Sequence, residues 1–156
     1  MLKERVLEIT KELVKIYSPT NTAEEQKVEQ YLLNLLQGMP YFKAYPELCG
    51  AFAAADDCFQ RSTIYGLVLG KSKKTVVFMG HHDVVSTEVY GALAQLATEP
   101  EALAQELARV DLPEEAFRDL ASGEWLWGRG TCDMKGGTAA QLAVLESYAQ
   151  APEAGS

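Results

Sequence analysis

The sequence lacks the features that would identify a membrane, secreted or nucleic-acid-binding protein. No apolar run approaches the length of a bilayer span, and the N-terminus has no apolar signal-peptide core. The three cysteines, Cys49, Cys58 and Cys132, form neither a disulfide framework nor a C-x-x-C pair. Basic residues are few: 14 Lys and Arg stand against 22 Asp and Glu, a net charge of −8. This balance disfavours nucleic acid and anionic membrane as partners, and the absences together predict a cytoplasmic protein.

What is present is the composition of a globular domain, with 47% hydrophobic and 23% charged residues in a chain of 156. Apolar residues at helical spacing and runs of β-formers predict its elements. Helices are expected over residues 2–16, 22–37, 101–110, 113–121 and 136–150, and strands over 62–69 and 75–79. Residues 1–150 are expected to fold and residues 151–156 to form a disordered tail.

The order of these elements predicts an α/β sandwich with a mixed sheet. Residues 70–74 are typical of a turn, so the two strands are expected to form a hairpin or to be close neighbours. Residues 76–79 are expected to be buried on both faces. Thr22 and Glu25 have the spacing of a capping box at the start of the second helix. Because so few strands leave a sheet edge open, self-association or marginal stability is expected.

Residues 88–124 are predicted to be a mostly helical, acidic insert, since so long a connection usually carries structure or function. Within it, residues 99–124 hold eight acidic and two basic side chains, which is −6 of the net charge of −8. Such a charge run is usually a solvated helical face. It could also attract a cationic substrate or partner, such as an arginine-containing compound.

The first candidate site motif is His81-His82-Asp83, directly after the apolar run at residues 76–79. Ligands of open α/β sheets gather past the carboxyl ends of strands. Alternation places His81 and Asp83 on one side of an extended chain and His82 on the other. Asp83 can then accept a hydrogen bond from the ring nitrogen of His81 that faces away from a metal, which makes the imidazole a better ligand. The simpler alternative is that both histidines are strand-end residues satisfied by the backbone.

The second motif is the glycine-rich stretch at residues 127–137, in which Asp133 precedes a Gly-Gly helix start. Asp133 could simply stabilise that helix N-terminus. A carboxylate can also bridge two metal ions about 3.5–4 Å apart, as in two-metal hydrolases. Imidazole and carboxylate are the ligand set of a hydrolytic zinc site. Lys135 could pair with a carboxylate or be solvated. Four other neighbouring residues are expected to be structural: Arg129, Cys132 as a small buried residue, and Trp125 and Trp127 in the core. Cys132 could instead bind metal.

These residues resemble the M20 family of zinc metallopeptidases and deacylases. The family's His-x-Asp motif is matched by residues 81–83, and its Gly-Arg-Gly-x-x-Asp-Met-Lys-Gly-Gly motif by residues 128–137. The resemblance covers nearly the whole chain, and its details are similar to the arginine-utilization (RocB-like) subgroup. It implies a three-layer α/β/α zinc-peptidase-like (phosphorylase/hydrolase-like) catalytic domain with a mixed sheet, of which residues 1–150 are the N-terminal, incomplete part.

The resemblance also implies residue roles. His81 and Asp133 are metal ligands, and Asp133 bridges two zincs. The peptide bond between Asp133 and Met134 is cis, and Asp83 is the catalytic carboxylate that holds His81. The cofactor is one or two Zn ions, with Co or Mn possible. The family's general-base glutamate and remaining ligands have no match here. The chain is therefore expected to be a truncated or split fragment, inactive by itself, with a missing C-terminal part or a second copy as partner.

The implied function is a zinc-dependent hydrolase of amide or peptide bonds, acting on a small peptide or N-acyl amino acid in arginine or amino-acid catabolism. One alternative is an M20-like binding or assembly module without catalysis. Another is a plain α/β domain in which the motifs are accidental.

Overall fold

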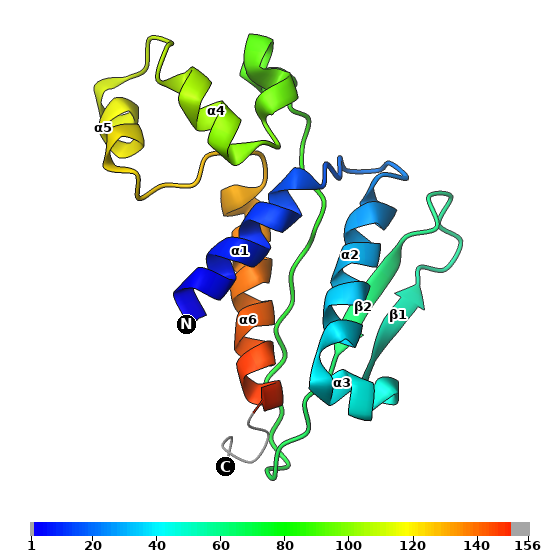
Figure 1. Ribbon diagram of the computed structural model, residues 1–156. Helices are drawn as coiled ribbons and strands as arrows, with labels where there is room; N and C mark the ends of the chain where they lie inside the picture. Colours follow the sequence, from blue (N-terminus) through cyan, green and yellow to red (C-terminus); the bar gives the residue numbers. More distant parts are fainter. Residues whose placement is uncertain (1, 151–156) are drawn as a thin grey trace.

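The computed structural model of the protein describes residues 2–150 (Figure 1). Helix α1 (Leu2–Lys15) crosses α6 (Gly136–Gln150), and α2 (Glu25–Gly38) lies against a two-stranded sheet beside them. We call residues 2–87 and 125–150 the body, and residues 88–124, which project from one end of it, the excursion. The predicted tail at residues 151–156 lies outside the described residues.

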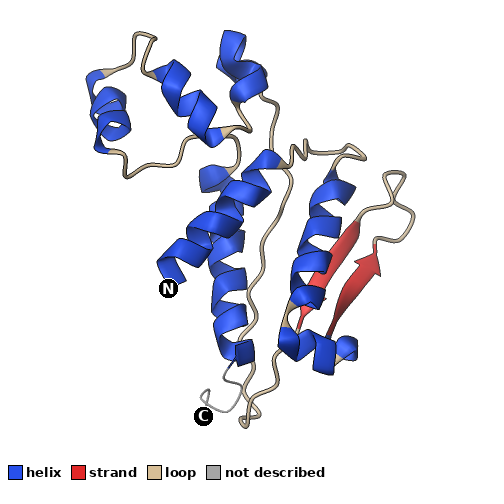
Figure 2. Cartoon of the chain, viewed as in Figure 1, coloured by secondary structure: helices blue, strands red, loops and turns tan. Residues whose placement is uncertain are grey.

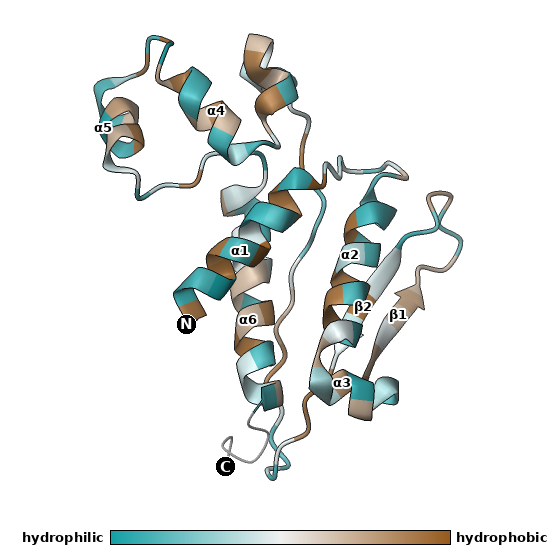
Figure 3. Cartoon of the chain, viewed as in Figure 1, coloured by the Kyte–Doolittle hydropathy of each residue, from teal (hydrophilic) through white to brown (hydrophobic). Residues whose placement is uncertain are grey.

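The centre of the body is a helical core. Apolar and polar residues alternate at helical spacing along α1 and α2, so that each helix buries one stripe (Figure 3). Six buried residues from three helices form one cluster: Ile9, Leu13, Val28, Leu32, Ala139 and Ala143. The alanines of α6 are small, which allows α1 to approach it closely. The helices predicted at both ends of the chain and after residue 22 are confirmed, with boundaries that differ by a few residues.

A small sheet adjoins this core. Strands β1 (Cys49–Ala53) and β2 (Ser62–Gly66) pair antiparallel, with Cys49 opposite Gly66. The preceding α3 (Pro40–Ala44) and 3-10 helix η1 (Pro46–Leu48) lead into β1. A β-carbon at Gly66 would lie 3.1 Å from Cζ of Phe42, so glycine permits the close packing of sheet and helix there. A second buried cluster results, made of Leu36, Met39, Phe42 and Cys49.

The predicted hairpin is wrong. Residues 74–80 do not pair with residues 62–69, and within the described residues the sheet is two-stranded and antiparallel rather than mixed. The segment runs instead as unpaired chain alongside α6 (Figure 2), where Gln141 Nε2 donates to the carbonyl of Met79 at 3.0 Å. The α/β class is confirmed in its coarse sense of mixed helices and strands, while the three-layer arrangement stays a prediction.

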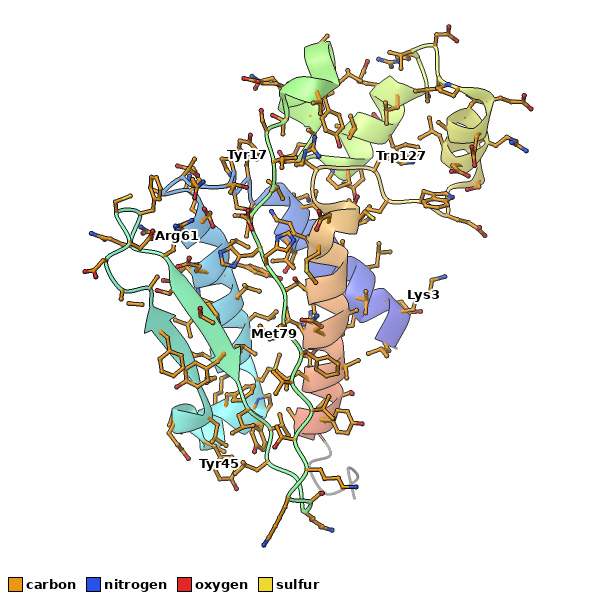
Figure 4. All side chains as sticks on the ribbon, turned by 180° about the vertical axis from the view of Figure 1, so that it is seen from behind. Lys3, Tyr17, Tyr45, Arg61, Met79 and Trp127 are labelled. Atoms are coloured by element: carbon orange, nitrogen blue, oxygen red, sulfur yellow. The ribbon has the colours of Figure 1, made fainter. Side chains whose placement is uncertain are left out.

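The burial expected for residues 76–79 is also wrong. Val76 is 78% exposed and Met79 is 82% exposed, and Met79 is seen on the extended segment beside α6 (Figure 4). An apolar run predicts a buried strand only if neighbouring strands and helices cover it on both faces. No strand among residues 2–150 pairs with this segment, and its apolar side chains remain exposed to solvent.

The excursion contains three short helices. They are the 3-10 helix η2 (Glu88–Leu96), which is broken at Gly91, then α4 (Pro100–Leu107) and α5 (Glu114–Ser122). Its attachment to the body is narrow. Ala97 and Leu103 are fully buried, and Lys11 of α1 forms an ion pair with Glu101 at 2.7 Å. No residue of α5 is buried, although its sequence is amphipathic.

Two smaller points complete the fold. The expected capping box is wrong in its partners: the Glu25 carboxylate accepts from the backbone N–H of Asn21 at 2.8 Å, and the Thr22 hydroxyl donates to the carbonyl of Pro19. The helix accordingly begins at Glu25 rather than at Thr22. Within residues 2–150, no helix has both the length and the apolar character that crossing a membrane requires.

Candidate metal and catalytic site

The first motif is held in place by the turn that follows α1. The Ser18 hydroxyl donates to the carbonyl of His82 at 2.7 Å, and the Val84 N–H donates to the carbonyl of Ser18 at 2.8 Å. The Thr20 N–H donates to the carbonyl of Val84 at 3.0 Å, and Pro19 and Val84 form an isolated parallel bridge. These bonds hold the backbone of residues 82–84, although the segment before them is unpaired.

The second motif is a tight turn in front of α6. Residues Thr131–Lys135 form a wide turn, η3, whose backbone is not helical at Asp133 and Met134, and the Lys135 N–H donates to the carbonyl of Gly130 at 2.8 Å. Gly130 has φ of 85°, and a β-carbon there would lie 2.7 Å from Cγ1 of Val84. Glycine is therefore needed both for the turn and for its contact with the first motif. The Asp133–Met134 peptide is cis, as the resemblance implies.

The packing of these two turns brings three predicted site residues together. His81 Nδ1 lies 3.0 Å from Asp83 Oδ1, and His81 Nε2 lies 2.8 Å from Asp133 Oδ1. The two motifs thus meet in space, as a shared metal site would require, and each ring nitrogen of His81 faces a different carboxylate. Asp83 holds the nitrogen that faces away from Asp133, so it orients the ring and sets the tautomer.

The electrostatics follow from this line of three groups. Partial burial alone would lower the pKa of His81, but the hydrogen bond with Asp133 and the charge of Asp83 outweigh it and raise that pKa. Burial would raise the pKa of Asp83, but the hydrogen bond from Thr20 and the charge of His81 hold it below its usual range. His81 is 48% exposed and Asp133 is 86% exposed, so an ion or ligand can reach the pair from solvent.

Sequence reasoning missed Thr20. Its hydroxyl donates to Asp83 Oδ2 at 2.6 Å, the carboxylate oxygen that does not face His81. Both oxygens of Asp83 are therefore engaged, one by the imidazole and one by the hydroxyl. The only signal was the Ser18-Pro19-Thr20-Asn21 stretch, which marks a helix end but does not indicate which distant residue it contacts.

His82 points away from this line, as strand alternation predicted. Its Nε2 lies 3.6 Å from Glu29 Oε1 and 3.9 Å from Glu25 Oε2, against the buried side of α2. Burial lowers the pKa of His82, and the charges of Glu29 and Glu25 only partly oppose it. His82 thus joins the motif to α2, with no contact to Asp133 recorded within the described residues.

Lys135, whose role the sequence left open, is a buried anchor. It is 1% exposed, and its Nζ donates to the carbonyls of Leu13 at 3.0 Å and Ile16 at 2.5 Å. These are carbonyls at the C-terminal end of α1, where a cation is favourable. Burial lowers the pKa of Lys135 to about 8, against the opposing charge of Asp83. The Asp133 turn is thereby held against the end of α1.

Two expectations for the neighbouring side chains are wrong. Cys132 is exposed rather than buried, and Trp125 is 61% exposed rather than part of the core. Both line an open pocket beside Asp133, because residues 124–128 return from the excursion along the surface of the body.

The donor set of His81 and Asp133 fits a divalent metal. Two ligands at zinc distances of roughly 2.0–2.2 Å and tetrahedral angles lie about 3.3–3.5 Å apart. To bind zinc, His81 Nε2 and Asp133 Oδ1, which lie 2.8 Å apart, would have to separate by roughly a few tenths of an ångström. The exposed Asp133 side chain can make that movement. Within residues 2–150, however, no group of three or more His, Cys, Asp or Glu side chains is arranged to hold a metal ion.

Comparison with known proteins supports the RocB-like part of the resemblance. The chain is 32% identical over 149 residues to Protein RocB of Bacillus subtilis (strain 168), covering 94% of this chain and 26% of RocB. It is 39% identical over 147 residues to the uncharacterized protein YqjN of the same organism, covering 92% of this chain and 26% of YqjN. The chain is thus related to RocB, and it spans about a quarter of the length of either relative. No protein-family model matches the chain, and no solved structure matches it.

Proposed function

We propose that this chain contributes a metal site to a zinc-dependent amide hydrolase of the M20 type, in a RocB-like protein of arginine utilization. The observation that carries the proposal is the line Asp83–His81–Asp133, in which one imidazole lies between two carboxylates. Such an arrangement orients the imidazole and leaves an exposed carboxylate beside its other nitrogen, as a metal site requires. The relation to RocB is consistent with this function, since the matched region includes both motifs.

In this proposal His81 Nε2 and Asp133 hold the metal, and Asp83 orients the His81 ring through Nδ1. Thr20 fixes Asp83 from the other side. When bound, zinc polarises an amide carbonyl and lowers the pKa of a water molecule. Co or Mn would serve the same donor set. The three-layer α/β/α domain is proposed for the whole protein, in which residues 67–80 would gain neighbours.

A binding or assembly role without catalysis is the second candidate. It is favoured by the absence, within residues 2–150, of a group of three or more metal-ligating side chains. A catalytic zinc normally has three protein ligands. The two candidates agree that His81 and Asp133 are close together, and they differ on whether these residues bind a metal.

Calorimetric titration of the 156-residue chain with zinc tests the proposal, with cobalt and manganese in parallel. We expect weak binding that His81→Ala or Asp133→Ala abolishes. Asp83→Asn should weaken it about 10- to 100-fold, since it removes the group that orients the ligand. Asp111→Ala, which removes an exposed carboxylate of the excursion, is the matched control and should leave zinc binding unchanged.

An assay on N-acyl amino acids and dipeptides accompanies the titration. We expect no turnover at an enzymatic rate by this chain, because losing proton transfer by a general base alone typically costs about 10²–10⁴-fold. Zinc affinity that is the same in the His81→Ala and Asp133→Ala variants would refute the metal site. Turnover by this chain would show that residues outside the proposed set complete it.

A further inference from the structure

A pocket beside Asp133 contains both tryptophans of the chain. Its volume is about 350 Å³, which is at the small end of the range for small-molecule sites. Trp125, Trp127 and Tyr90 supply aromatic walls, and Leu126 and the turn from Gly128 to Asp133 supply the rest. Trp127 lies where the chain returns from the excursion to the body (Figure 4). The pocket therefore has contributions from both parts of the molecule.

Arg129 is the one basic side chain that lines this pocket. Its guanidinium carbon lies 5.1 Å from the centre of the Tyr90 ring, a cation–π contact that fixes the side chain. The ion pairs formed within residues 2–150 do not include Arg129, and its buried Nε has no hydrogen-bond partner there. The neighbouring excursion is strongly acidic, so this lack of a partner does not reflect a shortage of carboxylates.

The buried Nε is closed to a ligand, so an anion in the pocket would meet the terminal nitrogens of the guanidinium, whose charge no carboxylate offsets within residues 2–150. Its planar fork matches the two oxygens of a carboxylate better than any single-point acceptor. The negative charge of Asp133 in the same pocket disfavours a second carboxylate beside it. An acid group is therefore expected at Arg129, and the uncharged part of the ligand towards Asp133.

We propose that this pocket binds small molecules that combine a free carboxylate with an apolar side chain, as an N-acyl amino acid does. Arg129 pairs with the carboxylate, and Tyr90 and Trp127 cover the side chain. As a substrate site this inference rests on the proposed function, because only then does the amide lie next to the metal held by Asp133. The binding itself requires no metal.

The two tryptophans are the only ones in the chain, so intrinsic fluorescence reports directly on the pocket. The metal-free 156-residue chain is titrated with N-acetyl-L-leucine and with its uncharged analogue, N-acetyl-L-leucinamide. We expect the acid to change the emission at concentrations about 10- to 100-fold lower than the amide, the range that a hydrogen bond to a charged group supplies. Acetate alone, which lacks the apolar side chain, should bind more weakly than the acid.

Variants identify the residue responsible. Arg129→Gln should remove the preference for the acid, and Arg129→Lys should keep only part of it, since lysine retains the charge without the fork. Arg118→Gln, an exposed arginine on α5, is the matched control and should keep the full preference. Circular dichroism establishes that each variant is folded, and if Arg129→Gln is not, the Arg129→Lys variant and the wild-type comparison of acid with amide decide.

Equal binding of acid and amide by the wild-type chain would overturn the inference, and so would a full preference in a folded Arg129→Gln variant. These outcomes are independent of the zinc titration. A chain that prefers the acid but binds no zinc would contradict the proposed hydrolase and leave the carboxylate pocket standing. A chain that binds zinc through His81 and Asp133 but shows no preference would contradict only the pocket.

Discussion

The body and the excursion use the same kind of amphipathic helix with different results. In the body, α1 and α2 bury their apolar stripes against α6, and the core residues there are almost completely inaccessible. In the excursion, α5 buries nothing, and Phe117 on it is 54% exposed. The difference teaches that an apolar stripe contributes stability only where another element covers it. The two motifs lie in the body, whereas the pocket beside Asp133 is lined in part by Tyr90 of the excursion.

The largest effect is expected from replacing a phenylalanine in each of the two regions. Phe42→Ala removes a side chain that is 1% exposed, and we expect it to lower the free energy of unfolding by about 3–5 kcal/mol. Phe117→Ala removes a half-exposed side chain from α5 and should cost less than about 1 kcal/mol. Urea denaturation followed by circular dichroism measures both. Similar costs at the two positions would mean that the excursion is part of the cooperative core.

A smaller effect separates a buried from an exposed lysine. Lys135→Met keeps most of the stem but leaves the carbonyls of Leu13 and Ile16 without their donor, which should cost about 1–3 kcal/mol of unfolding free energy. Lys27→Met on the exposed side of α2 breaks only a surface pair with Glu24 and should cost about 0.5 kcal/mol or less. Chemical denaturation again decides. If Lys135→Met is neutral, the anchor between the Asp133 turn and α1 contributes nothing to stability.

The smallest effect is a difference between two neighbouring residues. The chain has two histidines, both in the body, so their ring NMR signals report on the first motif alone. We expect His81 to titrate above the usual value of about 6.5 and His82 below it. Asp133→Asn should lower the pKa of His81 and leave that of His82 unchanged. Overlapping titration curves for the two rings would contradict the arrangement around them.

We expect the contributions of His81 and His82 to stability to depend on pH in opposite directions. The raised pKa of His81 means that its contribution is full below the unfolded-state pKa and is lost as the pH rises through the folded-state pKa. The lowered pKa of His82 means that the unfolded chain binds the proton more tightly. The stability linked to His82 is therefore lost as the pH falls through its unfolded-state value. Each histidine replaced separately by asparagine should remove its own part of the profile.

Much of the local structure could be predicted from the sequence. Helical spacing located α1, α2 and α6, and both motifs were visible as residue patterns before any contact was known. The alternation of His81, His82 and Asp83 predicted which ring faces which side, and the structure confirms it. These features depend on neighbours within a few residues, and local sequence determines those neighbours.

What the sequence could not predict is where unrelated segments meet. The burial of residues 76–79 was predicted wrongly because it depends on which strands lie beside them, and a one-dimensional pattern does not contain that information. The anchoring of Lys135 by α1 and the bond from Thr20 to Asp83 join residues 119 and 63 positions apart. The exposed Trp125 and Cys132 became walls of a pocket for the same reason.

By itself the sequence determined the helices, the glycine-dependent turns and the chemistry of His81, Asp83 and Asp133, because side-chain type and local spacing are written in it. Only the tertiary structure decided that these three groups lie within hydrogen-bonding distance of one another. It did so by packing Gly130 against Val84, a contact that no other residue type could make at that distance. Within residues 2–150 it also left Arg129 without an ion-pair partner in an aromatic pocket, since the excursion contacts Arg129 there through the Tyr90 ring.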